Sequence, residues 1–451
     1  MTGHYDERAL QEYLDHPESF PGRAALEQHL ERCDACRALL DELRAFEATL
    51  SADAVWEMTD SGSAAEAPEA LRALAELLAN EDRDAERLLA PLIASPAAFR
   101  RANVTAIAEM RTAGIVRRLC AESRALRERQ PMHALVLADA AIAIADQLSQ
   151  QRYPSPLLDE LRGSGWFERA NVLRYLGRYP EALDALAIAA RAYSRAPVPV
   201  FSGAMVDYTR AVIFAETDRL DQALRLARKS ARVFRQFGDD ERFVHAKMVE
   251  ACVRFHQDQF TESRALFASL VNVATNIGSP ETLARLYADV ANCDIELSDF
   301  ASAETYFARA LSLYEATGNE SGRIRTRWNL GTLRLAAGDL AEGLARLREA
   351  RREFEAIGAR TDAALVALEM AEVLLATGKP RGAHEAAELC SGLAESFAAV
   401  GMESHALTAL AWLRAAFQSG RATPALVQHV RQYIRTRPDQ DGRAFTPPPG
   451  I

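Results

Sequence analysis

The chain has 451 residues, of which 49% are hydrophobic and 26% charged, and its formal net charge is −10. This length allows two or three domains, and the composition is ordinary for a soluble protein. No apolar run approaches the roughly 20 residues of a membrane span, and the first residues lack the basic start and apolar stretch of a signal peptide. These features argue against an integral membrane protein, and we expect a cytoplasmic protein with no membrane partner.

The first 60 residues predict a small helical domain. Apolar residues recur at three- and four-residue spacing over residues 7–15, 23–31 and 35–50, which indicates three short helices. Helices this short cannot enclose a large core. A bound metal would compensate, because zinc contributes about 10–16 kcal/mol of apparent folding energy in small zinc modules.

A metal-ligand motif lies within this domain. His29 and Cys33 are four positions apart and so share one face of a helix, and Cys36 follows after a turn. A structural Zn²⁺ takes four nitrogen or sulfur ligands in a tetrahedron, and an upstream histidine can supply the fourth. We predict a Zn²⁺ site formed by His4, His29, Cys33 and Cys36, with His16 as the alternative to His4.

These residues resemble the zinc-containing anti-sigma factors, a bacterial family of small helical domains that hold sigma factors inactive. The matching residues are the HxxxCxxC motif, the preceding Ala25-Leu26-x-x-His29-Leu30, and Leu10-x-x-Tyr13-Leu14-Asp15. In that family a Cys or His stands just before the first helix, where His4 stands here. The resemblance implies a sigma factor as the partner, and the same fold also serves as a module in which zinc is purely structural.

Two further features bear on the role of this domain. Residues 1–60 contain 14 Asp and Glu against 5 Lys and Arg, a balance of −9, which suits a basic partner. The Cys33–Cys36 pair could also act as a redox switch, since oxidation to a disulfide would eject the zinc. Whether the zinc is structural or redox-sensing stays open at the level of the sequence.

Residues 61–150 are predicted to be a helical connector or cap with a degenerate first repeat near Ala134. A small, polar stretch ends at Pro68, which can begin a helix. The helix that follows either completes the zinc domain or caps the segment that comes next.

Residues 151–437 show an internal repeat. Small residues recur every 40 positions, each just after a turn: Ala223, Ser263, Ala303, Gly343 and Ala383. A second set lies before the turns: Ala211, Ala251, Ala291, Gly331 and Ala371. The pattern resembles tetratricopeptide repeats, whose usual period of about 34 positions is shorter, so we expect longer helices here. The resemblance implies an α-α superhelical solenoid of six or seven repeats, followed by a disordered tail over residues 438–451.

The repeat frame also predicts a partner-binding groove. By the family frame, first-helix residues that point into it are Asn171, Arg174, Arg285, Asn292, Trp328 and, near its edge, Arg325 and Asn329. Asparagine and arginine there could hold an extended peptide or its carboxylate. They do not complete the carboxylate-clamp pattern of some relatives, so the same residues could equally be a solvated surface.

Catalytic motifs are absent from the sequence. His384-Glu385 begins an incomplete HExxH that lacks its second histidine, and no phosphate-binding loop, nucleophile elbow or dinucleotide fingerprint occurs. The acidic charge disfavours direct nucleic-acid binding. We therefore expect an all-α, non-enzymatic regulator: an anti-sigma-like zinc domain joined to a tetratricopeptide array that binds a protein or peptide. The alternative is a tetratricopeptide adaptor or scaffold without a sigma factor.

Overall fold

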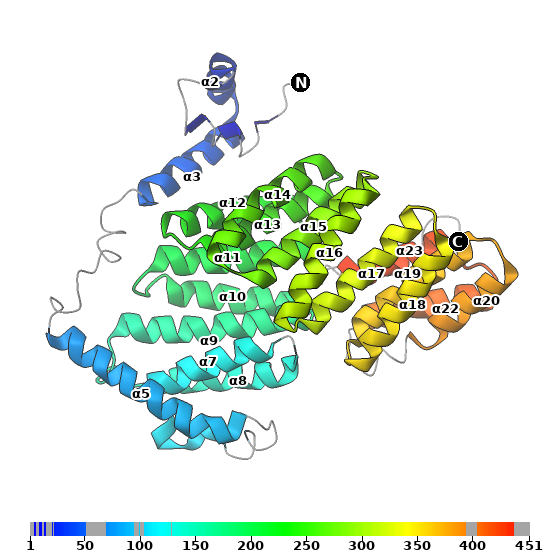
Figure 1. Ribbon diagram of the computed structural model, residues 1–451. Helices are drawn as coiled ribbons and strands as arrows, with labels where there is room; N and C mark the ends of the chain where they lie inside the picture. The colour runs from blue at the N-terminus through cyan, green and yellow to red at the C-terminus, as the bar shows by residue number, and fades with distance from the viewer. Residues whose placement is uncertain are drawn as a thin grey trace. The chain divides into compact units, whose positions relative to one another are not determined.

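The computed structural model describes residues 4–5, 9–10, 13–14, 20, 22–50, 69–93, 99, 103–127, 129–393 and 404–436 (Figure 1). The predicted tail, the polar stretch up to Pro68 and His16 lie outside these residues. The chain divides into two compact units, residues 1–207 and 208–451. All regular structure in the described residues is helical, which confirms the all-α prediction. None of the described helices is long and apolar enough to cross a membrane.

In the described part of the N-terminal segment, α2 (Arg23–Arg32) and α3 (Asp34–Leu50) are separated by Cys33 alone, and residues 9–10 and 13–14 before them are also helical. Cys33 has an extended backbone, with φ −122° and ψ 100°, and this ends α2. Leu26, Leu40 and Leu43 form a small buried core together with Leu10. The core is small because the helices are short, as their sequence predicts.

Helix α5 (Glu69–Ile93) packs against α7 (Ala113–Leu126). Its buried Glu81 carboxylate accepts hydrogen bonds from Gly114 N at 3.3 Å and Tyr153 Oη at 2.8 Å, and it pairs with Arg152. A fully bonded carboxylate joins these elements without an uncompensated buried charge. Helix α5 is thus attached to α7 and to the segment around Tyr153.

The rest of the first unit consists of antiparallel helix pairs. Two 3₁₀ turns, η1 (Val104–Ala106) and η2 (Ala108–Met110), lead into α7, which pairs with α8 (Pro131–Ala145). Helices α9 (Ser155–Tyr175) and α10 (Tyr179–Tyr193) form the next pair. Helix α11 (Pro199–Glu216) spans the boundary between the units.

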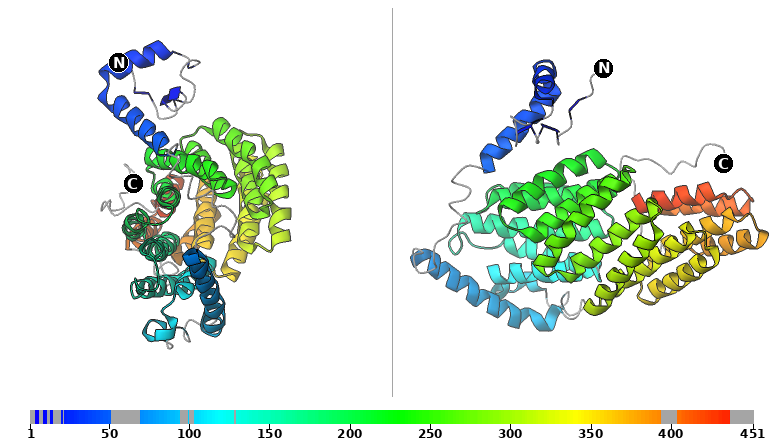
Figure 2. Two further views of the ribbon diagram at one scale, coloured as in Figure 1. Left: turned by 90° about the vertical axis from the view of Figure 1, so that its left-hand side faces the viewer. Right: turned by 45° about the horizontal axis from the view of Figure 1, so that its top comes forward.

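The second unit continues as a regular array, visible as stacked antiparallel helices in Figures 1 and 2. Its helices are α12 (Leu220–Gln236), α13 (Asp240–His256), α14 (Phe260–Ile277), α15 (Pro280–Glu296), α16 (Phe300–Thr317), α17 (Glu320–Ala336), α18 (Leu340–Ala356), α19 (Arg360–Ala376) and α20 (Pro380–Ser391). The second helices of the pairs begin at a constant spacing, at positions 220, 260, 300, 340 and 380. The helical repeat fold is thereby confirmed.

A residue with a left-handed backbone closes each half-repeat of this array. Positive φ values recur at a constant spacing, at Asp218, Gly238, Asp258, Gly278, Ser298, Gly318, Gly338, Gly358 and Gly378. The residue after it donates its N–H back across the last turn of the helix, as Asp339 N does to Arg334 O at 2.8 Å, which is a Schellman helix end. In several turns the same residue also caps the following helix: the Asp339 carboxylate accepts from Glu342 N. One turn design thus sets the length of the helices in the array.

Small residues let the helices of a pair approach closely. Ala291 and Ala303 are fully buried together with Phe307 and Leu333. At Gly331 an added Cβ would lie 3.0 Å from Leu347 Cδ2. The small residues that reveal the repeat in the sequence therefore lie at helix crossings.

The array ends with a change of packing. Helix α22 (Ser404–Gln418) is followed by α23 (Pro424–Thr436), which packs against α19 as well as α22. In the regular repeats, a second helix instead packs on the first helices on either side of it. Leu426, Val427, Val430 and Ile434 of α23 are buried in the core that includes Met370 and Leu374. Helix α19 thus packs against α23 in addition to α18 and α20, and this arrangement differs from the packing of the earlier first helices.

Candidate metal centre and repeat face

The four predicted metal ligands lie together. His29 is in the last turn of α2, Cys33 at the junction and Cys36 in the first turn of α3, while His4 approaches from the segment that precedes α2. One ligand atom from each residue can be chosen so that all lie within 4.8 Å of one another. The junction turns the two helices so that three ligands close together in the sequence converge with one that lies far upstream.

The distances between these atoms fit a tetrahedral ion. His4 Nδ1 lies 3.2 Å from Cys33 Sγ and 3.6 Å from Cys36 Sγ, and His29 Nε2 lies 3.3 Å from Cys36 Sγ. Tetrahedral zinc with Zn–N near 2.0–2.1 Å and Zn–S near 2.3 Å separates nitrogen from sulfur by about 3.5 Å. The donor set of two imidazoles and two thiols therefore matches a structural metal site in both chemistry and size.

The surroundings of the cluster orient its ligands. The Tyr5 ring packs edge-on against the His29 imidazole, with 5.1 Å between ring centroids. Burial raises the pKa of the Cys36 thiol, and the nearby Cys33 thiol raises it further. Without a cation this thiol would stay protonated, and a bound metal would deprotonate it. Of the groups of His, Cys, Asp and Glu in the described chain, this is the one whose arrangement could hold a metal ion.

The remaining cysteines are free thiols outside the cluster. Cys120, Cys293 and Cys390 are buried and Cys252 is half-buried. Burial raises the pKa of Cys120, Cys252 and Cys390 to about 12. They are therefore unreactive core residues at neutral pH.

The predicted groove residues are distributed over three first helices. Asn171 and Arg174 are on α9 in the first unit, and Arg285 and Asn292 are on α15. Asn171 is buried and donates to Phe167 O at 3.0 Å in its own helix, while the Arg174 guanidinium lies over the Tyr175 ring at 4.5 Å. Arg285 is exposed and Asn292 is half-buried.

Helix α17 carries the other three residues. Arg325 is exposed and pairs with Asp362 at 3.3 Å, and Asn329 is half-buried. Trp328 donates from Nε1 to Glu369 Oε2 at 2.8 Å and packs edge-on against Phe354. Trp328 is therefore held by α19 and by the core, an arrangement that sequence reasoning did not foresee.

A half-buried carboxyl on α15 was also missed. Asp289 lies one turn after Arg285, and burial raises its pKa to about 6, with the Arg285 charge acting in the opposite direction. The described residues offer this carboxyl no hydrogen bond and no ion pair. The signal in the sequence was available: Asp289 and Glu369 occupy the same position in helices that begin two repeat periods apart.

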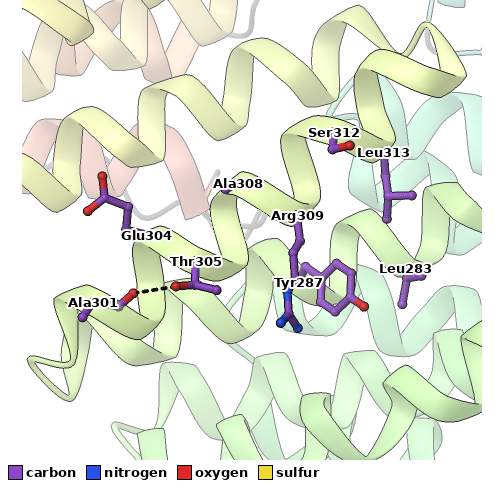
Figure 3. Close-up of a pocket in the computed structure, with 9 residues that line it drawn as sticks. All are labelled: Leu283, Tyr287, Ala301, Glu304, Thr305, Ala308, Arg309, Ser312 and Leu313. Atoms are coloured by element: carbon purple, nitrogen blue, oxygen red, sulfur yellow. Dashed lines mark hydrogen bonds between the residues drawn. The ribbon is translucent and has the colours of Figure 1, made fainter.

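A shallow hollow of about 900 Å³ lies over α15 and α16, apart from the predicted groove residues. Figure 3 shows Leu283 and Tyr287 of α15 opposite residues of α16. Its one carboxylate, Glu304, pairs with Arg334 of α17, and the Arg309 guanidinium lies 5.8 Å from the Tyr287 ring centroid. The described lining contains no histidine or cysteine, and Thr305 donates from Oγ1 to Ala301 O at 3.0 Å in its own helix.

The incomplete HExxH motif lies on α20. His384 is exposed and its Nε2 lies 3.3 Å from Glu388 Oε1, one helical turn away. No third ligand from the described chain joins these two residues. The motif is an exposed side-chain pair on a helix surface.

Comparison with known proteins agrees with the metal centre. Residues 7–37 match the family model described as "Putative zinc-finger". This match includes His29, Cys33 and Cys36 and begins just after His4. No curated protein matches the chain.

Several solved structures are similar to the helical array. Aspartyl phosphate phosphatase F from Bacillus subtilis is 14% identical, with 72% of this chain and 93% of that chain covered and a TM-score of 0.46. The quorum sensor NprR from B. thuringiensis, in its apo form, is 12% identical over 68% and 88%, with a TM-score of 0.44. The apo form of RapI is 13% identical over 61% and 97%, also with a TM-score of 0.44.

Proposed function

We propose that this protein is a cytosolic, non-enzymatic regulator in which a zinc-bound N-terminal domain holds a sigma factor and the repeats bind a protein or peptide. The observation that carries the proposal is the cluster of His4, His29, Cys33 and Cys36 within one short helical segment joined to a helical array. Zinc would be held by these four ligands and would fix α2 and α3 against each other. In this proposal, neither the hollow over α15 and α16 nor the predicted groove residues take part in catalysis.

Charge supports a basic partner for the N-terminal domain. Residues 1–60 hold nearly all of the net negative charge of the chain, with a balance of −9 against −10 for the whole. Sigma factors present basic surface to DNA, and an acidic domain can compete for such a surface by electrostatic complementarity. Binding by this route weakens with salt, because the Debye length falls to about 3 Å at 1 M ionic strength.

The second candidate is an adaptor in which zinc is purely structural. The observation that favours it is the small core of Leu10, Leu26, Leu40 and Leu43 beside the cluster. A core of this size needs a metal for stability whether or not a partner binds. In this candidate the repeats assemble other proteins and no sigma factor is bound.

Capture of partners by the full-length chain separates the two candidates. The zinc-loaded protein, its Cys36→Ser variant and a Cys120→Ser control are used to capture proteins from cells of the source organism, and the bound proteins are identified by mass spectrometry. The control makes the same chemical change in a buried thiol outside the cluster. The regulator predicts a sigma factor captured by the wild type and the control and lost with Cys36→Ser. Capture of other proteins without a sigma factor would favour the adaptor.

A further inference from the structure

The contact between α23 and α19 shows how a first helix of the array binds a cation. Arg431 of α23 places Nη2 2.8 Å from Glu372 Oε2 and Nη1 3.4 Å from Glu369 Oε2. Glu369 is 7% exposed and also accepts from Trp328 Nε1 and from Thr332 Oγ1 at 2.7 Å. The face of a first helix thus binds the guanidinium of an amphipathic helix through a nearly buried carboxylate.

The same face recurs on α15 in the array. Helices α15 and α19 begin at Pro280 and Arg360, which are two repeat periods apart. Asp289 is therefore equivalent to Glu369, and Asn292 is equivalent to Glu372. The neighbouring first helices carry Val249 and Asn329 at this position. Of these four equivalent positions, those on α15 and α19 carry carboxylates.

The two carboxylates differ in what they contact. Glu369 is saturated with donors from the chain itself, whereas the described residues give Asp289 neither a hydrogen bond nor an ion pair. The charge of Arg285, one turn earlier, lowers the pKa of Asp289 but does not overcome the effect of burial. A half-buried carboxyl without donors lowers stability, as its raised pKa also indicates. A ligand that supplies a cation would remove this cost.

We propose that Asp289 is the acceptor site for an arginine on an amphipathic helix of the protein partner, bound as Arg431 is bound by Glu369. The inference rests on the proposed protein-binding role of the repeats and names the chemistry of the partner: a helix with an arginine among apolar residues. Asn292 lies one turn along and can accept through its amide oxygen. A charge-assisted pair of this kind is among the stronger single contacts in proteins.

The test uses a labelled synthetic peptide of residues 422–436, which contains Arg431, titrated into the full-length chain. Removing one partner of a hydrogen bond to a charged group typically weakens binding by at least about tenfold. We therefore expect Asp289→Asn to weaken binding by at least about tenfold, and Arg431→Gln in the peptide to weaken it similarly. Conversely, Asn329→Asp, which adds a carboxylate at the next equivalent position, should tighten binding.

Two results would overturn the proposal. One is the absence of peptide binding at millimolar concentration. The other is an affinity that Glu369→Gln changes and Asp289→Asn does not, because the peptide would then merely exchange with α23. Asp289→Asn should leave the fold intact, since it removes an unfavourable charge, and its circular dichroism and melting temperature verify this. The capture experiment tests the metal cluster, whereas the peptide titration tests Asp289. A failed capture of a sigma factor and a failed titration are therefore distinguishable results.

Discussion

At the scale of single residues, Asp289 couples stability to pH. Its folded pKa of about 6 exceeds the ordinary 3.8, so the folded state binds the proton more tightly and stability falls as pH rises from about 4 to 6. Asp289→Asn should therefore stabilise the protein at pH 7, by at most about 3 kcal/mol, since each pKa unit corresponds to about 1.4 kcal/mol. Urea unfolding at pH 7 and at pH 4 measures the difference, which should vanish at the lower pH.

The matched comparison is Glu369→Gln, a similar change at the equivalent position. Glu369 accepts from Trp328 and pairs with Arg431, so its loss should destabilise the protein at pH 7 by about 1–3 kcal/mol. If both variants changed stability in the same direction, the contrast between a bonded and an unbonded carboxylate on this face would be wrong.

A second residue-scale prediction distinguishes the two candidate fourth ligands. Because His4 Nδ1 lies within 3.6 Å of both sulfurs, His4→Ala should lower zinc affinity by more than the roughly 10–100-fold that loss of an outer-shell partner costs. His16→Ala should leave it unchanged. Competition with a chromophoric chelator measures both affinities. A loss confined to His16→Ala would assign the fourth ligand to His16.

At the scale of elements, close backbone contact fixes α5 on α7. A Cβ added at Gly114 would lie 2.4 Å from the carbonyl carbon and oxygen of Glu81, whose backbone cannot move aside cheaply. Gly114→Ala should cost at least about 1–3 kcal/mol, the range for overpacked cores, and should increase amide hydrogen exchange in α5.

Gly203→Ala on α11 is the control for that change. Its added Cβ would meet nothing within 4 Å, so the helix should gain about 0.5–1 kcal/mol from the better helix former. Equal effects of the two substitutions on α5 exchange would show that α5 is held by contacts other than this one.

The sequence predicted the elements better than their pairing. Turns and small residues at a constant spacing gave the helical repeat, and HxxxCxxC gave the local part of the cluster because those ligands share consecutive turns. The sequence required a fourth ligand from an upstream histidine but left His16 as an alternative to His4, since a long stretch of chain separates both from Cys33 and Cys36 and no local rule spans that distance. The packing of α23 on α19 is a long-range contact, and the sequence indicates it only weakly. The one sign is that α19 has apolar residues on several of its faces, such as Val366, Leu368 and Met370.

At the scale of the whole molecule, zinc removal should act on one part only. The N-terminal core depends on a few leucines beside the metal ligands, whereas each repeat is held by its neighbours. Chelation should therefore abolish hydrogen-exchange protection over residues 23–50 and leave α13–α19 protected. Exchange followed by mass spectrometry, with and without added zinc, measures this. Unchanged protection of α2 and α3 after complete metal removal would contradict a structural role for the ion.

The residues with a left-handed backbone recur at a constant spacing, so the turns of the second unit fall at the same position in every repeat. A segment of one full repeat cut from between two equivalent turns would leave the flanking helices in register, since the new junction would join the same turn to the same helix start. Gain or loss of whole hairpins can therefore change the length of the array without a new turn or a new core. The number of helices that a partner can span is thus a quantity that evolution, or an engineer, can adjust in steps of one hairpin.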